Sequence, residues 1–400
     1  MIPAGLRTIA QLWLSILLTE RIEKLTNWKI PLFDINFGPE EQEVVAEVLQ
    51  SGWLTMGPKT QTFEQRFAQV HGSPHGIAVS SCTAALQLAF AALGIGAGDE
   101  VIMPSMTFVA SANAAAVCGA TPIFADIVCE AEPTIDPDHI ASLITPRTRA
   151  ILVVHYAGYA CRMDEIMQIA DRHHLPVVED CAHAPQVQHN GRYLGAIGAI
   201  GCFSFFSNKN MTTAEGGMAL THDEQLASSM RLLRSHGMTT GTWERHNERP
   251  QDYDVVDFGW NFRIDELRAA LGLVQLEKVA QANARRAELT SRYRSLLSEV
   301  PDVQVAFQHN LAASACHILP LLTRDLENRK VIEHKLNQAR VQTSHHYPPV
   351  HLFKKYRDEF NYQEGMLPYS ESFSAKEITL PLYPDMSNAH IDYIVNSLHA

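Results

Sequence analysis

The chain has 400 residues, of which 46% are hydrophobic and 19% charged, so it can bury a large core and is expected to form two or three domains. Its 44 acidic residues outnumber its 32 basic residues, giving a formal net charge of −12, which disfavours nucleic acid as a partner. Seven scattered cysteines without a C-x-x-C pair indicate neither a disulfide framework nor a zinc site, and they fit a reducing, cytoplasmic location.

Residues 1–30 are interpreted as an N-terminal extension. Its apolar stretch IAQLWLSILL (9–18) is far shorter than the roughly 20 residues that a membrane span needs, and no small-residue cleavage site follows it. We therefore predict no membrane association and a short amphipathic helix that packs on the body or on a partner. A cryptic signal peptide is the alternative.

From Phe33 onward, short β-branched runs alternate with stretches of helical periodicity. The runs are GIAVS (76–80), EVIMP (100–104), TPIFAD (121–126), AILVVHY (150–156), PVVED (176–180) and GCFSFF (201–206). Such alternation predicts βαβ units in an α/β fold, with a mostly parallel sheet that binds ligands at the carboxyl ends of its strands.

The alternation of apolar runs and helical stretches ends at residues 264–298, whose periodicity predicts one long helix. Its apolar face is expected to carry Leu267, Leu271, Val274 and Val279. A smaller α+β segment follows, with a strand-like run at 315–322 and a helix-like run at 325–339. We assign residues 31–298, including the long helix, to a large domain and residues 299–400 to a small C-terminal domain.

Three features at predicted strand ends suggest chemistry. SSCTAALQLAF (80–90) opens a helix directly after a strand, which directs hydroxyl and main-chain N–H groups at one point and favours a phosphate, although plain N-capping is the alternative. Asp180 ends an apolar strand, where a carboxylate needs a cationic partner unless it caps a following helix. Lys209 follows a later strand; it is either a solvated lysine or an amine held for reaction with a carbonyl.

Taken together, a phosphate cradle, a buried carboxylate and a lysine are the three anchors that pyridoxal 5'-phosphate requires, for its phosphate, its pyridine nitrogen and its aldehyde. His183, three residues after Asp180, would face the same side if a helical turn follows, although a lone histidine is more often structural. We therefore predict a pyridoxal phosphate site, with no metal.

Longer motifs support this interpretation through a resemblance. They are GWLTMGPKTQTFEQRFA (52–68), GDEVIMPSMTFVASANA (98–114), VEDCAHA (178–184), GCFSFFSNKNMTTAEGGMALT (201–221), FGWNFRIDELRAALGLVQLEK (258–278) and HHYPPVH (345–351). Over about residues 33–400 the chain resembles the DegT/DnrJ/EryC1/StrS family of sugar aminotransferases. The resemblance implies a fold-type-I, aspartate-aminotransferase-like architecture and a homodimer with shared active sites. It also implies transfer of an amino group from glutamate or glutamine to a keto group of a nucleotide-linked sugar, in amino-sugar, surface polysaccharide or secondary-metabolite biosynthesis.

The resemblance also assigns roles to residues. Lys209 stands where the family's Schiff-base lysine stands, Asp180 where the partner of the pyridinium nitrogen stands, and His183 near the ring, and these three are the predicted catalytic residues. The further predicted cofactor contacts are Phe108 on the ring, Cys82, Thr83 and Ser204 at the phosphate, and Asn261, which reaches the phosphate of the neighbouring subunit. The predicted substrate contacts are Arg245, Arg249, His346 and Tyr347. Cys82 and Ala214 stand where the family more often has glycine.

Sugar transamination has three alternatives. A branch of the family acts on keto-cyclitols, and another consists of sugar dehydratases in which histidine replaces the lysine. A non-catalytic regulatory homologue would be expected to lose the lysine or the aspartate. Because Lys209 and Asp180 are both present, the sequence favours ping-pong transamination, with the acceptor and the amino donor still open.

Overall fold

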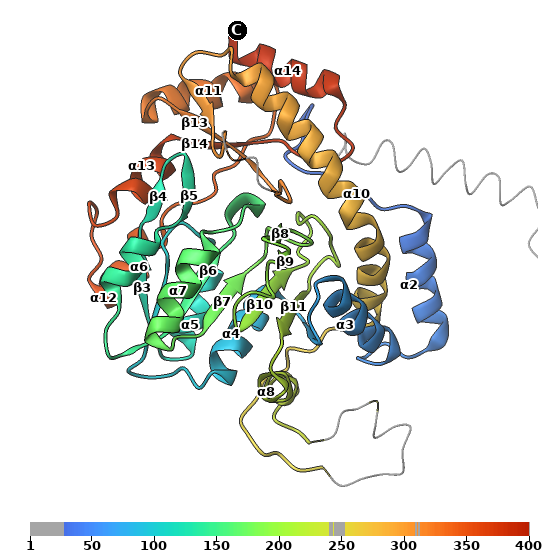
Figure 1. Cartoon of the computed structure of the whole chain (residues 1–400). Helices are drawn as coiled ribbons and strands as arrows, with labels where there is room; N and C mark the ends of the chain where they lie inside the picture. The colour runs from blue at the N-terminus through green and yellow to red at the C-terminus, as the bar shows by residue number, and fades with distance from the viewer. Residues whose placement is uncertain (1–27, 240–242, 244–252, 309, 311–312, 400) are drawn as a thin grey trace, which may run out of the picture.

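The computed structural model describes residues 28–239, 243, 253–308, 310 and 313–399 (Figure 1). The apolar stretch at 9–18 lies outside these ranges, as do Arg245 and Arg249. Figure 1 shows a large α/β body, a smaller α+β body above it, and the long helix α10 (Glu266–Leu297) running between the two. The domain boundaries given above stay predictions. Among the residues described, none of the helices has the length and apolar character of a membrane span.

The large body is built on a seven-stranded sheet. In spatial order its strands are β1 (His75–Val79), β11 (Gly217–Thr221), β10 (Ile200–Ser204), β7 (Val177–Asp180), β6 (Thr148–Val154), β2 (Glu100–Pro104) and β3 (Thr121–Ala125). β11 pairs antiparallel with both of its neighbours, and the other pairs are parallel. The prediction of a mostly parallel sheet is confirmed, and each of the six predicted strands is present.

Helices cover the sheet on both faces, which explains why its strands are buried along nearly their whole length. These helices are α2 (Pro39–Ser51), α3 (Pro58–Val70), α4 (Cys82–Ala92), α5 (Ala110–Val117), α6 (Pro137–Leu143), α7 (Met163–His173) and α8 (Glu224–Arg234). On one face Phe63 and Phe67 of α3 pack with Phe203, and on the other Leu86 and Phe90 of α4 pack in a second apolar cluster. Short hairpins add β4 (Ile127–Cys129) with β5 (Glu132–Ile135) and β8 (Gln188–His189) with β9 (Arg192–Tyr193).

The small body contains a three-stranded antiparallel sheet with its own apolar core. Its strands are β12 (Val303–Val305), β13 (Leu319–Thr323) and β14 (Glu377–Leu380), and the helices of this part of the chain are α11 (Leu326–Gln338), α12 (Lys354–Phe360), α13 (Pro368–Lys376) and α14 (Asn388–His399). The predicted strand at 315–322 begins only at Leu319, so residues 315–318 lead into it as extended chain outside the ladder. Tyr293 of α10 is part of this core, which fixes the long helix to the small body.

The predicted helix at 264–298 is confirmed, but its predicted apolar face is wrong in part. Leu267, Leu271 and Val274 are only partly buried, and of the four predicted residues Val279 alone is buried. The buried stripe of α10 combines apolar residues such as Leu276 and Leu289 with small and polar ones such as Gly272 and Gln275. A Cβ atom on Gly272 would lie 2.6 Å from Cζ of Phe63, so α10 packs closely against α3 at a position without a side chain, which hydrophobic periodicity does not reveal.

Candidate active site

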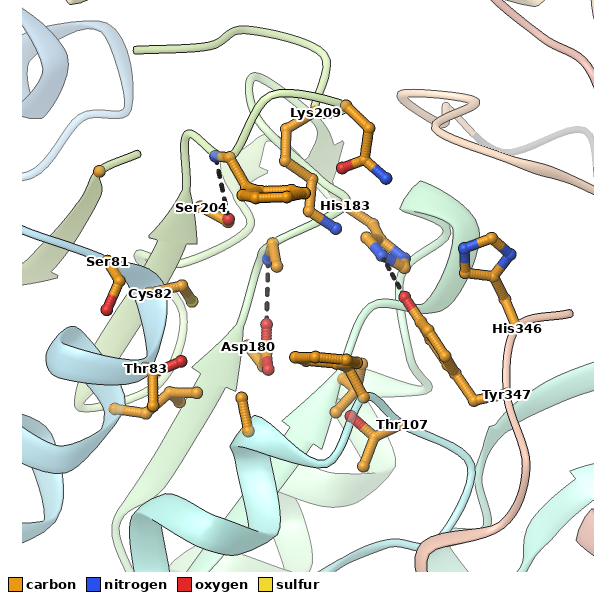
Figure 2. Close-up of a pocket in the computed structure, with 18 of the residues that line it drawn as sticks. Ser81, Cys82, Thr83, Thr107, Asp180, His183, Ser204, Lys209, His346 and Tyr347 are labelled. Atoms are coloured by element: carbon orange, nitrogen blue, oxygen red, sulfur yellow. Dashed lines mark hydrogen bonds between the residues drawn. The ribbon is translucent and has the colours of Figure 1, made fainter. Parts of the chain in front are cut away.

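A cavity of about 320 Å³ lies at the carboxyl-terminal edge of the seven-stranded sheet (Figure 2). Its walls come from segments that follow β1, β2, β7 and β10, because the carboxyl ends of parallel strands meet at one edge of a sheet. Of the predicted site residues, Cys82, Thr83, Phe108, Asp180, His183, Ser204, Lys209, His346 and Tyr347 line it. A cavity of this size accommodates a small molecule.

The start of α4 forms one wall of the cavity. Ser81 caps the helix, since its hydroxyl accepts a hydrogen bond from the N–H of Ala84 at 3.1 Å. The N–H groups of Cys82 and Thr83 precede the first bonds of the helix and are therefore available to an anion at its positive end. A Cβ atom on Gly217 would lie 2.5 Å from the carbonyl carbon of Ser81, so β11 approaches this wall closely because position 217 is glycine. N-capping and a phosphate site are thus compatible here.

Asp180 ends β7 with its carboxylate facing the cavity (Figure 2). One oxygen accepts from the hydroxyl of Ser111 at 2.8 Å and the other from the N–H of Ala182 at 3.0 Å. No helix follows Asp180, so it is not a helix cap. Burial raises the pKa of Asp180, while these two donors and the positive charge of Lys209 lower it, and the net direction is upward. The carboxylate is therefore an incompletely compensated buried charge that favours a cation in the cavity.

Lys209 enters the same cavity from the loop after β10 (Figure 2). Desolvation lowers the pKa of its amine from 10.5 to about 8, and the negative charge of Asp180 opposes this change. An amine with such a pKa is partly neutral near neutral pH, which is the form that attacks a carbonyl. The alternative of a solvated surface lysine does not fit this environment.

His183 and Tyr347 form a hydrogen-bonded pair on the far wall of the cavity (Figure 2). Nδ1 of His183 accepts from the N–H of Ala157 at 3.3 Å, so the ring proton of a neutral His183 sits on Nε2 and is donated to the hydroxyl of Tyr347 at 3.1 Å. Burial, with the neighbouring positive charge of Lys209, lowers the pKa of His183 well below its usual value. His183 is therefore a neutral group that orients Tyr347.

His346 is also held in one orientation. Its Nδ1 lies 2.8 Å from the hydroxyl of Thr379, and its main-chain N–H donates to Glu377 at 2.9 Å. Burial, followed by the charges of Lys209 and His345, lowers the pKa of His346 to about 3. His346 therefore presents an uncharged ring to the cavity at neutral pH.

Phe108 and Asn261 are both exposed predicted cofactor contacts, and they differ in where they lie. Phe108 lines the cavity yet is 59% exposed, as expected of an aromatic ring that has an open face for a ligand. Asn261 is exposed and does not line the cavity of its own chain, although the next residue, Phe262, accepts a hydrogen bond from Ser80 beside the helix start. A role for Asn261 at the site of a neighbouring subunit stays a prediction.

Glu179, next to Asp180, corrects the prediction of a fully apolar strand. Its buried carboxylate lies 3.0 Å from Nε2 of His155 and accepts from the N–H groups of Gly195, Ile197 and Gly198 at 2.6–2.8 Å. Glu179, His155 and Cys181 lie close enough together to suggest metal ligands. The carboxylate oxygens are already occupied by four donors, so the group is better explained as a clamp that fixes the loop at 195–198 to β7.

The cavity residues fit pyridoxal 5'-phosphate. The helix start and its hydroxyls suit a phosphate, the unpaired carboxylate of Asp180 suits a protonated pyridine nitrogen, and the amine of Lys209 suits an aldehyde. The exposed ring of Phe108 suits a flat heteroaromatic ring. The fold and the site therefore define a pyridoxal-phosphate-dependent enzyme of fold type I.

Comparison with known proteins identifies the family. Residues 36–399 match the model of the DegT/DnrJ/EryC1/StrS aminotransferase family, and the chain belongs to that family. It is 39% identical over 366 residues to the spore coat polysaccharide biosynthesis protein SpsC of Bacillus subtilis. The aligned residues cover 90% of this chain and 94% of SpsC. The protein is thus a pyridoxal-phosphate-dependent aminotransferase.

Solved structures agree with this assignment. Helicobacter pylori PseC, an aminotransferase of pseudoaminic acid biosynthesis, superposes with a TM-score of 0.85 at 29% identity, covering 92% of this chain and 97% of PseC. The pyridoxal phosphate form of the putative sugar aminotransferase Spr1654 from Streptococcus pneumoniae gives 0.86 at 30% identity, with the same two coverages. The predicted family, fold and cofactor are confirmed.

Several residues that shape the cavity were not predicted from the sequence. Thr107, Asn208, Glu215 and Gly216 also line it, and Ser111 reaches Asp180 from α5. His317, from the small body, lies 3.4 Å from Nζ of Lys209. His317 could have been suspected from the sequence, because it is a polar residue in the otherwise apolar run ACHILPLL (315–322). Nothing in the sequence around Ser111 pointed to its contact with Asp180.

Proposed function

We propose that this aminotransferase transfers the amino group of glutamate or glutamine to the keto group of a nucleotide-linked sugar, in the cytoplasm. The observation that carries the reaction type is the convergence of Lys209 and Asp180, from two different strands, on one cavity beside a helix start. The sugar acceptor is supported by the relatives, since SpsC is named for polysaccharide biosynthesis and PseC for pseudoaminic acid biosynthesis. Lys209 disfavours the dehydratase alternative, which has histidine at this position.

The residues of the cavity have separable tasks in this proposal. When bound, pyridoxal phosphate supplies a protonated ring that accepts the electron pair left when a neighbouring C–H bond breaks. Asp180 keeps the proton on the ring nitrogen, and Phe108 holds the ring from one face. Lys209 binds the aldehyde through Nζ and, once released as a neutral amine, accepts the proton from the α-carbon of the amino donor. The same amine returns a proton when the acceptor occupies the cavity, which gives ping-pong kinetics.

We further propose a homodimer with shared sites. The segment that leads to Asn261 is unusually apolar for a surface, with Val255 54%, Val256 58% and Phe258 95% exposed. An exposed apolar stretch of this kind is typical of an interface. It supports an arrangement in which Asn261 of each subunit reaches the cofactor phosphate of the other. Arg245 and Arg249 stay predicted contacts of the acceptor.

A screen of acceptors tests the proposed function. The purified enzyme is converted to its pyridoxamine form with glutamate or glutamine and mixed with nucleotide-linked keto sugars, free keto sugars and keto-cyclitols. We expect a nucleotide-linked keto sugar to restore the absorbance of the lysine-bound pyridoxal form and to gain an amino group by mass spectrometry. Restoration by keto-cyclitols alone would contradict the proposed acceptor, and absence of the donor half-reaction would contradict transamination. The Lys209→Ala variant is the control for turnover at this site.

A further inference from the structure

His317 brings the small body into contact with the amine of Lys209. Its Nε2 lies 3.4 Å from Nζ of Lys209, and its ring is 4% exposed. The main chain of His317 is held from two sides, because its N–H donates to the carbonyl of Ala157 at 3.0 Å and its carbonyl accepts from Arg286 at 3.3 Å. The position of this imidazole is therefore fixed jointly by the large body and by α10.

A chain of hydrogen bonds fixes which nitrogen of His317 carries the proton. One end of the Asn210 side chain lies 2.7 Å from the carbonyl of Ala315, which can only accept, so this end is the amide NH₂ group. The same NH₂ group donates to Asn283 at 2.7 Å, and Asn283 in turn donates to the carbonyl of Pro185 at 2.9 Å. The oxygen of Asn210 therefore faces Nδ1 of His317 at 2.8 Å, and Nδ1 must carry the proton.

The consequence is a lone pair directed at the lysine. In a neutral imidazole with its proton on Nδ1, Nε2 is an acceptor, and Nζ of Lys209 is the donor that faces it. Neutrality is consistent with the surroundings, because burial, followed by the nearby positive charges of Lys209 and Arg286, lowers the pKa of His317 well below its usual value. His183 cannot take this role, since its ring nitrogens are engaged with Ala157 and Tyr347.

We propose that His317 is a positioning residue for Lys209, an uncharged hydrogen-bond acceptor whose tautomer is locked by Asn210 and which aims the ε-amine into the cavity. The proposal rests on the proposed role of Lys209. A neutral acceptor suits this task better than a carboxylate, because a second negative charge beside Asp180 would stabilise the ammonium form and reduce the fraction of reactive amine. His317 is not assigned the role of a base, since its ring does not compete with Lys209 for a proton.

The test separates orientation of the amine from general damage to the site. Cofactor-free full-length protein is mixed with pyridoxal phosphate, and the rate of covalent attachment at Lys209 is followed by quenching with borohydride and measuring the mass of the labelled peptide. The affinity for pyridoxamine 5'-phosphate, which has no aldehyde, is measured in parallel. His317→Leu should slow attachment by about 10- to 100-fold, the range for a reacting group displaced by roughly 1 Å, while its affinity for pyridoxamine phosphate stays within about threefold of the unmodified protein.

His317→Gln provides the rescue, because its amide oxygen can accept from Lys209 without carrying a titratable proton. Attachment should return to within about threefold of the unmodified rate if acceptance of a hydrogen bond is the role of His317. His71→Leu removes another buried histidine, which bonds to the main chain of Phe67 and Gln186 and does not line the cavity, and should leave the attachment rate unchanged. An unchanged rate in His317→Leu, or a Gln variant as slow as the Leu variant, would overturn the inference. Absence of label on Lys209 in the unmodified protein would instead refute the proposed role of the lysine.

Discussion

Replacing Asp180 by asparagine should stabilise the cofactor-free protein while impairing the reaction. The hydrogen bonds survive the change, because the new amide oxygen can accept from Ala182 and the new NH₂ group can donate to Ser111. Ser111 can reverse its own bond, since either it or Thr107 can be the donor at 2.9 Å. The substitution removes a buried carboxylate, a group whose pKa is raised by burial. Because the folded protein no longer has to bury this charge, we expect a gain of about 1–3 kcal/mol in the free energy of unfolding.

The pH dependence of this gain follows from the direction of the pKa shift. A carboxyl group whose pKa is higher in the folded than in the unfolded state binds its proton more tightly when folded, so it loses stability as the pH rises through these values. The gain in the free energy of unfolding that Asp180→Asn brings should therefore be complete at neutral pH. It should vanish as the pH falls below the pKa that the Asp180 carboxyl group has in the unfolded chain. Denaturant unfolding of both cofactor-free proteins across this range measures it.

Activity should move in the opposite direction. An asparagine cannot keep a proton on the ring nitrogen of the cofactor, and the loss of such an electrostatic partner should lower turnover by roughly 100-fold or more. Asp126→Asn is a matched control for stability, because Asp126 accepts from four donors, including the N–H groups of Tyr369 and Ser370, and an amide there would be destabilising. If Asp180→Asn were less stable than the unmodified cofactor-free protein at neutral pH, our account of an uncompensated carboxylate would be refuted.

Three further predictions concern the lysine, the loop after it and the interface. Lys209→Ala should still bind pyridoxamine phosphate, but it should lose borohydride labelling and its turnover should fall by more than about 1,000-fold. In the unmodified protein, the rate at which pyridoxal phosphate attaches to Lys209 should rise with pH up to about 8 and then level off. Near-normal turnover in Lys209→Ala would disprove the role of Lys209 as the reacting amine. Ala214→Gly should raise the free energy of unfolding by about 0.5–1 kcal/mol, because Ala214 has a φ of 68°, a left-handed conformation that glycine adopts without strain. Ala280→Gly, in the middle of α10, is the control and should lower the free energy of unfolding by about 1 kcal/mol. Equal effects of the two substitutions in thermal unfolding would contradict this reasoning. Asn261→Ala should weaken cofactor affinity about 10- to 100-fold, and a stable monomer with full affinity would rule out the shared site.

Much of the site could be predicted because its residues lie at strand ends. The order of apolar runs in the chain indicates a parallel sheet, and in such a sheet the ends of β1, β7 and β10 must meet, so the helix start at 82, Asp180 and Lys209 were predicted to converge. The chemistry of each group then follows from its type. A carboxylate, an amine and a helix start at one edge of the sheet require a ligand with complementary groups, whatever the details of packing.

Other features depend on contacts between distant parts of the chain. Local hydrophobicity predicted the existence of α10 but only part of its buried face, because the contact of Gly272 with Phe63 depends on the shape of α3. The close approach of β11 to the start of α4 depends on the absence of a side chain at Gly217, where the two touch. Periodicity reports the average polarity of a surface, whereas close packing depends on the shape of the partner element.

By itself, the sequence predicted the order of strands and helices and, through its motifs and the family they resemble, the cofactor and the residues assigned to its phosphate, ring nitrogen and aldehyde. The tertiary structure alone decided the protonation pattern around Lys209, because the tautomer of His317 depends on Asn210, which lies 107 positions away in the chain, and through it on Asn283 and two main-chain carbonyls. A proton sits on one nitrogen or the other according to which neighbours can only donate or only accept, and that information is created when the chain folds.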